Sequence, residues 1–504
     1  MNKIKQQFQK DFEESNNNVN LTFDVSQLEP NILTKEDEIR LAKERRKRRG
    51  KIIGIVSFSA IAIAVVAIPI ASNINVDESV TTARRRLSVN ASALAESNSV
   101  RKLNDISYPN SDAPMKNELS ENEINAFNEF SNTTYHSLVN VSKADNMSYA
   151  TIGLYSILNE LYGAISREDL QTQFDNLLGL NEESRTNFYN KVMRANSFVS
   201  KESTTQLKNA AFFDNAYDPN PEYINKLSKL YCECYETDLQ TNASKLVEWV
   251  EKAVDTKGFI DEKFLGVDPF TVLYYFSTLY FKNAWAYKYL SETNIEDAFY
   301  LSNGTTTQVT YMQHEFYTDK YYDYGSYISF SDIYMNRYAT VTYIIPKDTK
   351  DNIFDLTRNV NIFEENIEKE VSTKHDEYYE PIIVNLKTPK FKTKSDLDFK
   401  ACFESLGFGD MFDNNIDSFH KAFLEEGSEG VRFYLQQAKQ RNEIEFNEDG
   451  SIVKSLSMGA MGGDKSAEPF RDALDVKLNQ PFIYIIKDIN GVPILVGHVD
   501  NPKY

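Results

Sequence analysis

The residues that come closest to a catalytic motif lie between positions 459 and 466. Gly459-Ala460-Met461-Gly462-Gly463-Asp464-Lys465-Ser466 has the spacing of a phosphate-binding loop, whose backbone amides and lysine hold nucleotide phosphates. Asp464 stands where such a loop has its second glycine, and its carboxylate would repel a phosphate. Pro469 follows where a helix should begin. We therefore interpret these glycines as a source of flexibility and not as a nucleotide site.

Other catalytic chemistry has no support in the residue pattern. The histidines show neither an HExxH motif nor a pairing at metal-ligand spacing: His136, His314, His375, His420 and His498. Cys232 and Cys234 are separated by one residue, which does not fit a CxxC redox or zinc motif, and Cys402 is far away in sequence. No GxSxG motif occurs. We expect no enzyme activity, no metal, no cofactor and no disulfide framework.

A long connection near the carboxyl terminus is the most informative element. A strand-like run, 444–447, ends at Glu448-Asp449-Gly450, and thirty residues pass before Pro481. Loops of this length in compact domains are usually functional. The first part of the loop places small or uncharged side chains at every second position: Ser451, Val453, Ser455, Ser457 and Gly459. Since alternate residues of a strand share a face, this part can serve both as a loop and as a strand with one buried face.

The segment after this loop predicts two closing strands. Residues 476–486 have the apolar pattern of a buried strand, Asn490-Gly491 indicates a hairpin turn, and 494–502 end the chain. In this order, the hinge, the exposed loop, the Pro481-Phe482 strand and the "LxxGxVxNP"-like ending resemble the serpin family. Further matching segments lie upstream: Asn209–Phe212, Tyr280–Trp285, Val309–Met312 and Leu386–Phe391, with helical segments near Ser148–Gly163 and Leu397–Gly407.

The resemblance covers roughly residues 118 to 504 and implies an α+β fold. A large central, mostly antiparallel sheet, further sheets and about nine helices are expected. It also implies a suicide-substrate mechanism, in which a serine or possibly cysteine protease cleaves the reactive-centre loop, about 450–475. The loop then inserts into the central sheet before the acyl-enzyme is hydrolysed. The implied partner is a protease, and we expect the inhibitor to be a monomer.

The position of the cleaved bond stays open between several residues. Counting from Gly450 as the family loop runs reaches Asp464, and one residue more reaches Lys465, with Ser466 after the bond. We favour Lys465-Ser466, which suits trypsin-like proteases. The remaining segment is longer than usual in the family, so Met461 and Phe470 stay open as cleavage sites for elastase-like or chymotrypsin-like enzymes.

The resemblance also assigns a hinge and a sheet-opening region. The hinge comprises Glu448, Gly450, Ser451, Val453, Ser455 and Ser457; the sheet-opening region comprises Ser148, Thr151, Ser277, Trp285 and Gln440. Val453 and Lys454 replace the small hinge residues that inhibitory members prefer, so we expect slower insertion. Ser277 and Gln440 replace the asparagine and histidine of the family, and a hydroxyl and an amide can still hydrogen-bond to each other.

The amino-terminal part predicts a membrane anchor. Residues 52–71 are twenty uncharged, mostly apolar residues, enough for a helix to cross a bilayer. A basic run, 45–51, precedes them, which favours a cytoplasmic amino terminus. We therefore divide the chain into a largely disordered cytoplasmic tail with a basic juxtamembrane helix (1–51), a transmembrane helix (52–72), an extracellular stalk (73–117) and a serpin-like domain (118–504). A cleaved signal peptide is the alternative.

We interpret the basic run as a signal for membrane orientation and not as a nucleic-acid site, because the chain carries a net charge of -19. The acidic, Tyr-rich and Asn-rich composition suggests a bacterial source. Two functions compete on this evidence. The first is a protease inhibitor displayed on the cell surface. The second is a non-inhibitory surface protein whose loop is a passive protease substrate.

Overall fold

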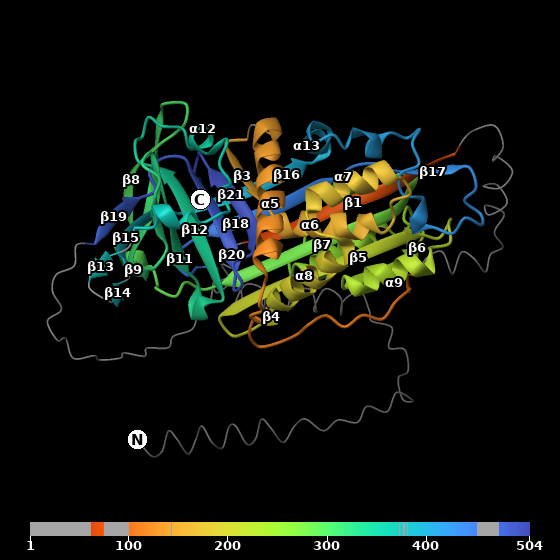
Figure 1. The fold of residues 1–504 in the computed structure, drawn as a ribbon, viewed down its shortest axis with the longest axis horizontal. Coiled ribbons are helices and arrows are strands. Elements are labelled where there is room, and N and C mark those ends of the chain that lie inside the picture. The colour runs from red at the N-terminus through yellow and green to blue at the C-terminus, as the bar shows by residue number, and fades with distance from the viewer. Residues whose placement is uncertain are drawn as a thin grey trace, which may run out of the picture. The chain divides into compact units, whose positions relative to one another are not determined.

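A central sheet of nine strands organises the part of the chain that the computed structural model describes, namely residues 62–74, 100–142, 144–371, 373–375, 378–380, 382–450 and 473–504 (Figure 1). All of them belong to one unit, residues 59–504. The main path of the sheet is β16 (Phe391–Asp398), β18 (Lys439–Phe446), β1 (Ala62–Ile74), β7 (Thr271–Asn283), β5 (Ser203–Asp214), β6 (Cys232–Thr237) and β2 (Arg101–Lys102). β17 (Val431–Leu435) pairs with β1, and β4 (Ser197–Val199) pairs with β5.

Two smaller sheets and a strand pair complete the β-structure. The six-stranded sheet has the order β10 (Tyr321–Asp323), β11 (Tyr327–Ile333), β12 (Ala339–Pro346), β20 (Phe482–Asp488), β21 (Pro493–Val499) and β3 (Asn146–Tyr149). The four-stranded sheet consists of β19 (Leu474–Lys477), β15 (Ile382–Pro389), β9 (Thr306–Thr318) and β8 (Ile295–Tyr300). β13 (Thr373–His375) pairs with β14 (Tyr378–Glu380). Most neighbours are antiparallel, whereas β5–β6 and β15–β19 are parallel.

Nine α-helices lie in the described part of the chain. They are α5 (Glu121–Ser142), α6 (Thr151–Tyr162), α7 (Glu168–Leu178), α8 (Glu182–Ala195), α9 (Pro221–Lys229), α10 (Ala243–Ala253), α11 (Glu262–Leu265), α12 (Ile353–Thr357) and α13 (Lys400–Ser405). Short 3₁₀ turns occur at Ser291–Thr293, Met335–Arg337, Ile367–Lys369, Gly409–Phe412 and His420–Ala422. All twelve residues of α6 are buried, because this helix packs against the central sheet. The expected α+β class with a large central sheet is confirmed.

The apolar amino-terminal segment is a strand and not a helix. Residues 62–71, which we expected within a transmembrane helix, form most of β1 in the middle of the central sheet. No helix in the described ranges is long and apolar enough to span a bilayer. The helix prediction is therefore wrong for residues 62–71 in this structure. The physical reason is that a strand covered on both faces and a membrane helix require the same uninterrupted apolar composition.

The pairing of β1 fits its sequence. β1 runs antiparallel to β7 on one side and to β18 and β17 on the other (Figure 1). Val66 lies opposite both Ser277 and Gln440. Pro69 lies where the β18 ladder has ended and the β17 ladder has not begun, and its carbonyl accepts a hydrogen bond from the Gln436 amide at 3.1 Å. Since proline cannot donate to a ladder, it is tolerated at such an interruption.

Both faces of β1 are covered over residues 66–72. Val66, Ile68 and Ile70 belong to the main hydrophobic core, and a Cβ at Gly153 of α6 would lie 3.0 Å from Val66 Cγ2. Ala67 belongs to the second core cluster on the opposite face. Each of residues 66–72 is buried. The amino-terminal segment thus forms a buried strand between β18 and β7 of the central sheet.

Several predicted boundaries differ from the structure. Residues 100–117, assigned to an exposed stalk, contact the central sheet: β2 pairs with β6, and the Tyr108 hydroxyl donates to the Asn209 carbonyl at 2.7 Å. The strand expected at 476–486 is two strands, β19 and β20, which belong to different sheets. Ser148 lies in β3, before the helix in which we expected it. The hairpin turn at Asn490-Gly491 is confirmed between β20 and β21.

Candidate hinge and insertion site

The predicted hinge follows β18 directly. β18 ends at Phe446, and the turn 447–450 closes with a hydrogen bond from the Gly450 amide to the Asn447 carbonyl at 3.3 Å. The Asp449 amide donates to Asn447 Oδ1 at 3.1 Å. The chain is described again from position 473, and β19 then runs at the edge of the four-stranded sheet. The segment between them, 451–472, therefore joins the central sheet to a different sheet.

Gly450 is held against the end of β7. It forms an isolated antiparallel bridge with Ala284, one residue beyond β7, and its φ is +88°. A Cβ at this position would lie 2.5 Å from the Trp285 amide nitrogen and 2.7 Å from the Asn283 carbonyl oxygen. Only glycine combines this left-handed conformation with so close a backbone approach. The hinge glycine thus already occupies a strand position between β18 and β7.

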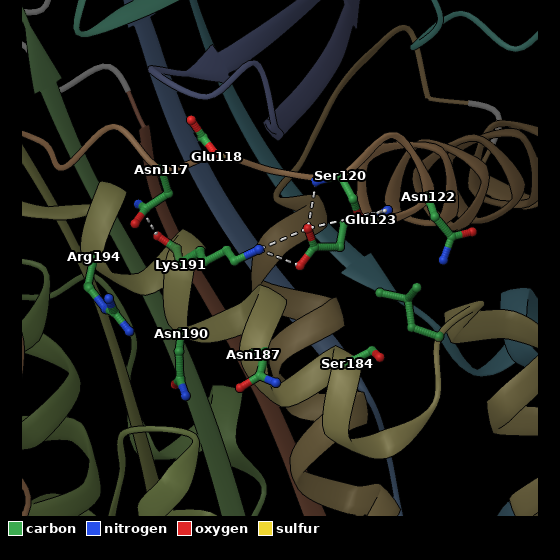
Figure 2. A pocket seen from close by; sticks show the side chains of 11 residues that line it. Asn117, Glu118, Ser120, Asn122, Glu123, Ser184, Asn187, Asn190, Lys191 and Arg194 are labelled. Atoms are coloured by element: carbon green, nitrogen blue, oxygen red, sulfur yellow. Dashed lines mark hydrogen bonds and ion pairs between the residues drawn. The ribbon is translucent and has the colours of Figure 1, made fainter.

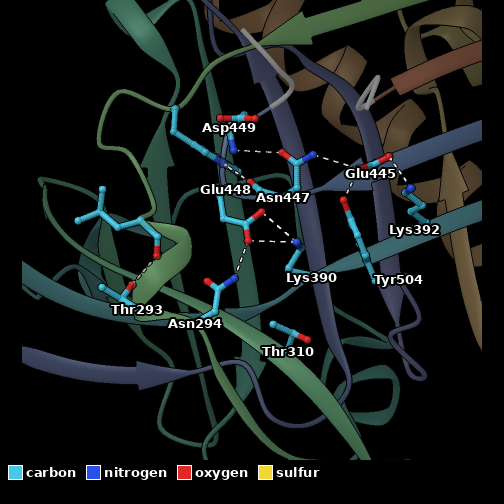
Figure 3. A network of polar contacts seen from close by, with 12 residues as sticks. Thr293, Asn294, Thr310, Lys390, Lys392, Glu445, Asn447, Glu448, Asp449 and Tyr504 are labelled. Carbon is cyan, nitrogen blue, oxygen red and sulfur yellow. Dashed lines mark hydrogen bonds and ion pairs between the residues drawn. The ribbon is translucent and has the colours of Figure 1, made fainter. Parts of the chain in front are cut away.

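An ion pair fixes the other side of the turn (Figure 3). Lys390, which follows β15, lies 3.0 Å from the Glu448 carboxylate, and Asn294 Nδ2 donates to the same carboxylate at 2.5 Å. Burial by itself raises the pKa of Glu448, but the hydrogen bonds from Asn294 and Lys390 outweigh it and hold that pKa below its ordinary value. Glu448 is therefore a charged anchor that ties the hinge to the four-stranded sheet.

The carboxyl terminus extends the same polar network. The Tyr504 hydroxyl donates to Glu445 Oε1 at 2.7 Å, and Asn447 Nδ2 donates to the same oxygen at 3.0 Å (Figure 3). The Lys390 and Lys392 ammonium groups lie 4.2 and 4.6 Å from the centre of the Tyr504 ring. The sequence did not single out Tyr504, Asn294 or Glu445. Lys390 was visible only as part of the matching segment Leu386–Phe391.

Trp285 contacts the hinge turn through a hydrogen bond from its indole. Its side chain is fully buried, and its Nε1–H donates to the Asn447 carbonyl at 3.0 Å. The indole stacks on Tyr334, with ring centres 4.6 Å apart. The structure therefore joins Trp285 to the hinge turn, at the end of β7.

Three of the sheet-opening residues, Ser148, Thr151 and Gln440, meet at the start of α6. Gln440 Oε1 accepts from the Ala150 amide at 2.9 Å, and Gln440 Nε2 donates to the Ala150 carbonyl at 3.1 Å. The Ser148 amide and hydroxyl both donate to Ser395 Oγ, at 3.0 and 3.1 Å. Thr151, the first residue of α6, donates to the Pro493 carbonyl at 2.5 Å. Gln440 therefore connects β18 to the beginning of the helix that covers β1.

The predicted contact between Ser277 and Gln440 is absent. Val66 of β1 lies between them, Gln440 is engaged with Ala150, and Ser277 Oγ is buried without a hydrogen-bond partner among the described residues. A buried hydroxyl without a partner costs free energy. The inserted strand β1 thus explains why the prediction is wrong.

The remaining predicted site residues lie outside the described residues. They are the hinge residues Ser451, Val453, Ser455 and Ser457, and the candidates for the cleaved bond, Met461, Asp464, Lys465, Ser466 and Phe470. The hinge and cleavage assignments for these positions therefore stay predictions.

A polar depression lies between the start of α5 and α8, away from the hinge (Figure 2). Two of its charged residues are paired with each other, because Lys191 Nζ lies 2.8 and 3.0 Å from the Glu123 carboxylate oxygens. Ser120 caps α5 reciprocally, since its amide donates to Glu123 Oε2 at 2.7 Å and its hydroxyl accepts from the Glu123 amide at 3.2 Å. We interpret this depression as a capped helix start with a polar lining.

The cysteines and histidines form no cluster that could hold a metal ion among the described residues. Cys232 and Cys234 on β6 and Cys402 on α13 are buried free thiols. Burial raises the pKa of Cys402 to about 11, so its reactive thiolate is disfavoured at neutral pH.

Comparison with known proteins agrees with this arrangement. A family model described as "Serpin (serine protease inhibitor)" matches residues 125–502. Serpin-Z7 of Hordeum vulgare is 24% identical over 390 residues, which cover 72% of this chain and 91% of the relative. Serpin I2 of Homo sapiens is 23% identical over 388 residues, which cover 72% and 88%.

Solved structures share the fold. The native state of the thermophilic serpin tengpin has a TM-score of 0.61 at 18% identity and covers 78% of this chain and 97% of its own. Native protease nexin-1, solved with heparin, also gives 0.61 at 18% identity and covers 76% and 100%. The family model spans about three quarters of the chain, including the hinge, the sheet-opening residues and the closing strands. The chain therefore belongs to the serpin family, whose members are generally protease inhibitors.

Proposed function

We propose that this serpin is a suicide-substrate inhibitor of serine proteases, with cysteine proteases as a secondary class. The protease hydroxyl attacks the carbonyl carbon of Lys465. The bond to the Ser466 nitrogen breaks, the hydroxyl proton passes to the departing amine, and an acyl ester joins the loop to the protease. Insertion of the loop between β18 and β7 then separates the ester from the protease's deacylation machinery.

The bridge between Gly450 and Ala284 is the observation that carries this proposal. It places the first loop residue at the head of a strand position flanked by β18 and β7. A loop that continued from Gly450 in the same register would put Ser451 opposite Asn283 and Val453 opposite Phe281. The uncharged residues at every second position, from Ser451 to Gly459, would then share one face of the inserted strand. That face could be buried against the core.

The test is the formation of an SDS-stable adduct with a trypsin-like protease. The carboxy-terminal peptide released should begin at Ser466, as measured by mass. A peptide beginning at Gly462 or Arg471 would move the cleaved bond to Met461 or Phe470 and change the protease class. The proposal is refuted if neither the full chain nor the strand variant described below forms an adduct with any protease that cuts the loop.

A matched pair of substitutions, each made in the strand variant described below, separates insertion from cleavage. Ser451→Arg would bury a charge in the inserted strand, at a cost of several kcal/mol or more. It should be cut at the same bond without forming an adduct. Ile452→Arg lies on the opposite face and should retain more adduct. Equal behaviour of the two variants would contradict the proposed register.

A second function is favoured by one specific observation. β1 already occupies the position between β7 and β18 from Ala62 onward. A loop that is cut in this state therefore has no free strand position to enter along that part of the sheet. The chain would then be a passive substrate. Thermal stability distinguishes the two functions when it is measured on the strand variant described below, because cleavage raises the melting temperature only if the loop inserts.

Display at the cell surface is a separate proposal, supported by the basic run 45–51 before the apolar residues 52–71. Residues 62–71 cannot be a membrane helix and β1 at the same time, so this proposal concerns another state of the segment. Protease added to intact cells should remove the chain after position 73 and spare the first fifty residues. A soluble mature protein beginning near Asn73 would contradict it and indicate signal-peptide cleavage.

A further inference from the structure

One segment of this chain, β1, stands where the loop would have to insert. The loop leaves the central sheet from the end of β18, and β1 occupies the position beside Lys439–Glu443 of that strand. β1 is antiparallel to both β18 and β7. A loop that turned back from Gly450 would have the same direction. β1 therefore has the neighbours and the direction of an inserted loop.

The register makes this correspondence specific. Gly450 lies opposite Ala284, and Ala62 lies opposite Phe281. Only the positions opposite Asn283 and Lys282 lie between them. An antiparallel continuation from Gly450 would bring Val453 to the place that Ala62 occupies. Insertion beyond two residues thus requires β1 to leave.

The inner faces of the two segments can be compared position by position. Val66, Ile68 and Ile70 of β1 lie opposite Ser277, Tyr275 and Leu273, and they point into the main core. In the register of Gly450, the same places would receive Ser457, Gly459 and Met461. The β1 side chains remove more apolar surface from water at two of the three places. β1 is therefore the better occupant of this position.

The Ser277 hydroxyl indicates a second state of the sheet. It is buried and unpartnered because Val66 separates it from Gln440. Since Val66 lies opposite both residues, closing the sheet without β1 would bring Ser277 and Gln440 into register. A hydroxyl can donate to an amide oxygen or accept from an amide nitrogen. The residue pair is thus suited to a sheet from which β1 is absent.

We propose that β1 is a built-in blocking strand for the insertion site, and that withdrawal of residues 62–74 converts the chain from a protease substrate into an inhibitor. This inference rests on the proposed inhibitory function. With β1 in place, a protease cuts the loop and departs. With β1 withdrawn, the position beside β18 is free and the cut loop enters it.

The test uses the full chain with Ile68→Asp, which puts a charge at a fully buried position of β1. Val199→Asp in β4 is the matched control, because Val199 is 44% exposed. Residues 62–74 contain no Lys or Arg, so a trypsin-like protease cannot cut the strand itself. Two quantities are measured for each protein: the yield of SDS-stable adduct, and the change in melting temperature after the loop is cut.

We expect wild type and Val199→Asp to be cut with little adduct and no rise in melting temperature. Ile68→Asp should give about tenfold more adduct or better, since a tenfold change corresponds to ~1.4 kcal/mol of strand binding, and its melting temperature should rise on cleavage. A synthetic peptide of residues 62–74 added to Ile68→Asp should reverse both changes. Ile68→Ala repeats the test with a milder change should Ile68→Asp fail to fold.

Two other outcomes separate failure of the blocking role of β1 from failure of the inhibitory function. If wild type forms as much adduct as Ile68→Asp and gains thermal stability on cleavage, β1 does not block insertion, and the inhibitory function stands without the inference. If both proteins are cut with neither adduct nor a gain in stability, the inhibitory function itself is refuted. Adduct and a gain in stability in wild type would show an open sheet, whereas their absence needs the Ile68→Asp measurement to separate a blocked sheet from a protein that does not inhibit.

Discussion

Truncating one side chain of β1 measures how firmly the strand is held. Ile68 is fully buried in the main core and lies opposite Tyr275 of β7. Val66, two residues earlier in β1, lies opposite Gln440 of β18. Ile68→Ala removes three side-chain carbon atoms from this core and leaves a cavity. Such changes cost about 2–5 kcal/mol when the surroundings relax only partly. We take about 3 kcal/mol as the expected loss.

The loss should act on the strand before it acts on the whole fold. Over the 446 residues of the unit 59–504, an unfolding entropy of ~2.1 cal/mol/K per residue means that 3 kcal/mol lowers the melting temperature by only about 3 °C. Local opening of β1 is the more sensitive quantity, because 3 kcal/mol corresponds to roughly a 150-fold change in an equilibrium constant. Amide hydrogen exchange reports that opening directly.

The assay is hydrogen exchange of peptides that cover residues 62–74 in wild type, Ile68→Ala and Ile68→Val. Wild-type amides should be protected like those of β7. Ile68→Ala should exchange roughly 100-fold faster in this segment only, and Ile68→Val, which costs about 1 kcal/mol, about fivefold faster. If the wild-type segment exchanges without protection, or if both substitutions leave its exchange unchanged, residues 62–74 are not a strand of the sheet and the reasoning fails.

Three further predictions concern the hinge and the core. Gly450→Ala should lower the free energy of unfolding by about 1–2 kcal/mol or more, since φ is +88° and the Cβ would lie 2.5 Å from the Trp285 amide nitrogen; an unchanged denaturation midpoint would contradict this geometry. The lowered pKa of Glu448 means that its stabilising contribution is complete above 4.5 and is lost as the pH falls through the folded-state pKa. Thermal melts from pH 7 to 3 should therefore fall less steeply for Glu448→Gln than for wild type, and parallel curves would show that the carboxylate contributes nothing. Glu365→Gln should cost about 3–5 kcal/mol by urea denaturation, because it leaves the buried Lys487 ammonium without the carboxylate 3.2 Å away; the exposed partner variant Lys320→Gln should cost under about 1 kcal/mol, and equal costs would contradict this assignment.

The carboxy-terminal part of the fold was predictable because its pattern has one interpretation. Asn490-Gly491 between two apolar runs specifies a hairpin, which the structure has between β20 and β21. The division of 476–486 into two strands was not predictable from periodicity. Pro481 interrupts the apolar pattern at that point, but the change of sheet depends on contacts with β12 and β15, which lie more than 80 residues away.

β1 shows the limit of the sequence argument most clearly. Residues 52–71 contain no polar face, and this excludes an ordinary surface helix. It does not distinguish a bilayer from the interior of a sheet that is covered on both sides, since both environments accept only apolar side chains. Pro69 was the available signal, because a proline breaks a helical ladder but fits the gap between β17 and β18. The interruption itself could be known only from the structure.

The polar hinge contacts were out of reach for a related reason. Glu448 was identified as part of the hinge, but its partners Lys390 and Asn294 come from segments that precede it by more than 50 and 150 residues. Tyr504 reaches Glu445 from the end of the chain. Nothing in the spacing of these residues links them, and the Ser277–Gln440 contact failed because a strand from a third segment lies between them.

The long sequence separation between β1 and its partners has a kinetic consequence. More than 370 residues lie between Ala62 and Lys439, whereas Gly450 follows Phe446 by only four. Contacts between distant segments form late, because closing a long loop costs more entropy and slows folding. A newly completed chain should therefore have an open sheet for some time before its own amino-terminal strand arrives. When the protein is refolded from denaturant and sampled over time, the yield of adduct should be highest at the earliest time points and should then fall. The rate at which β1 enters the sheet would thus set how long the protein remains an active inhibitor.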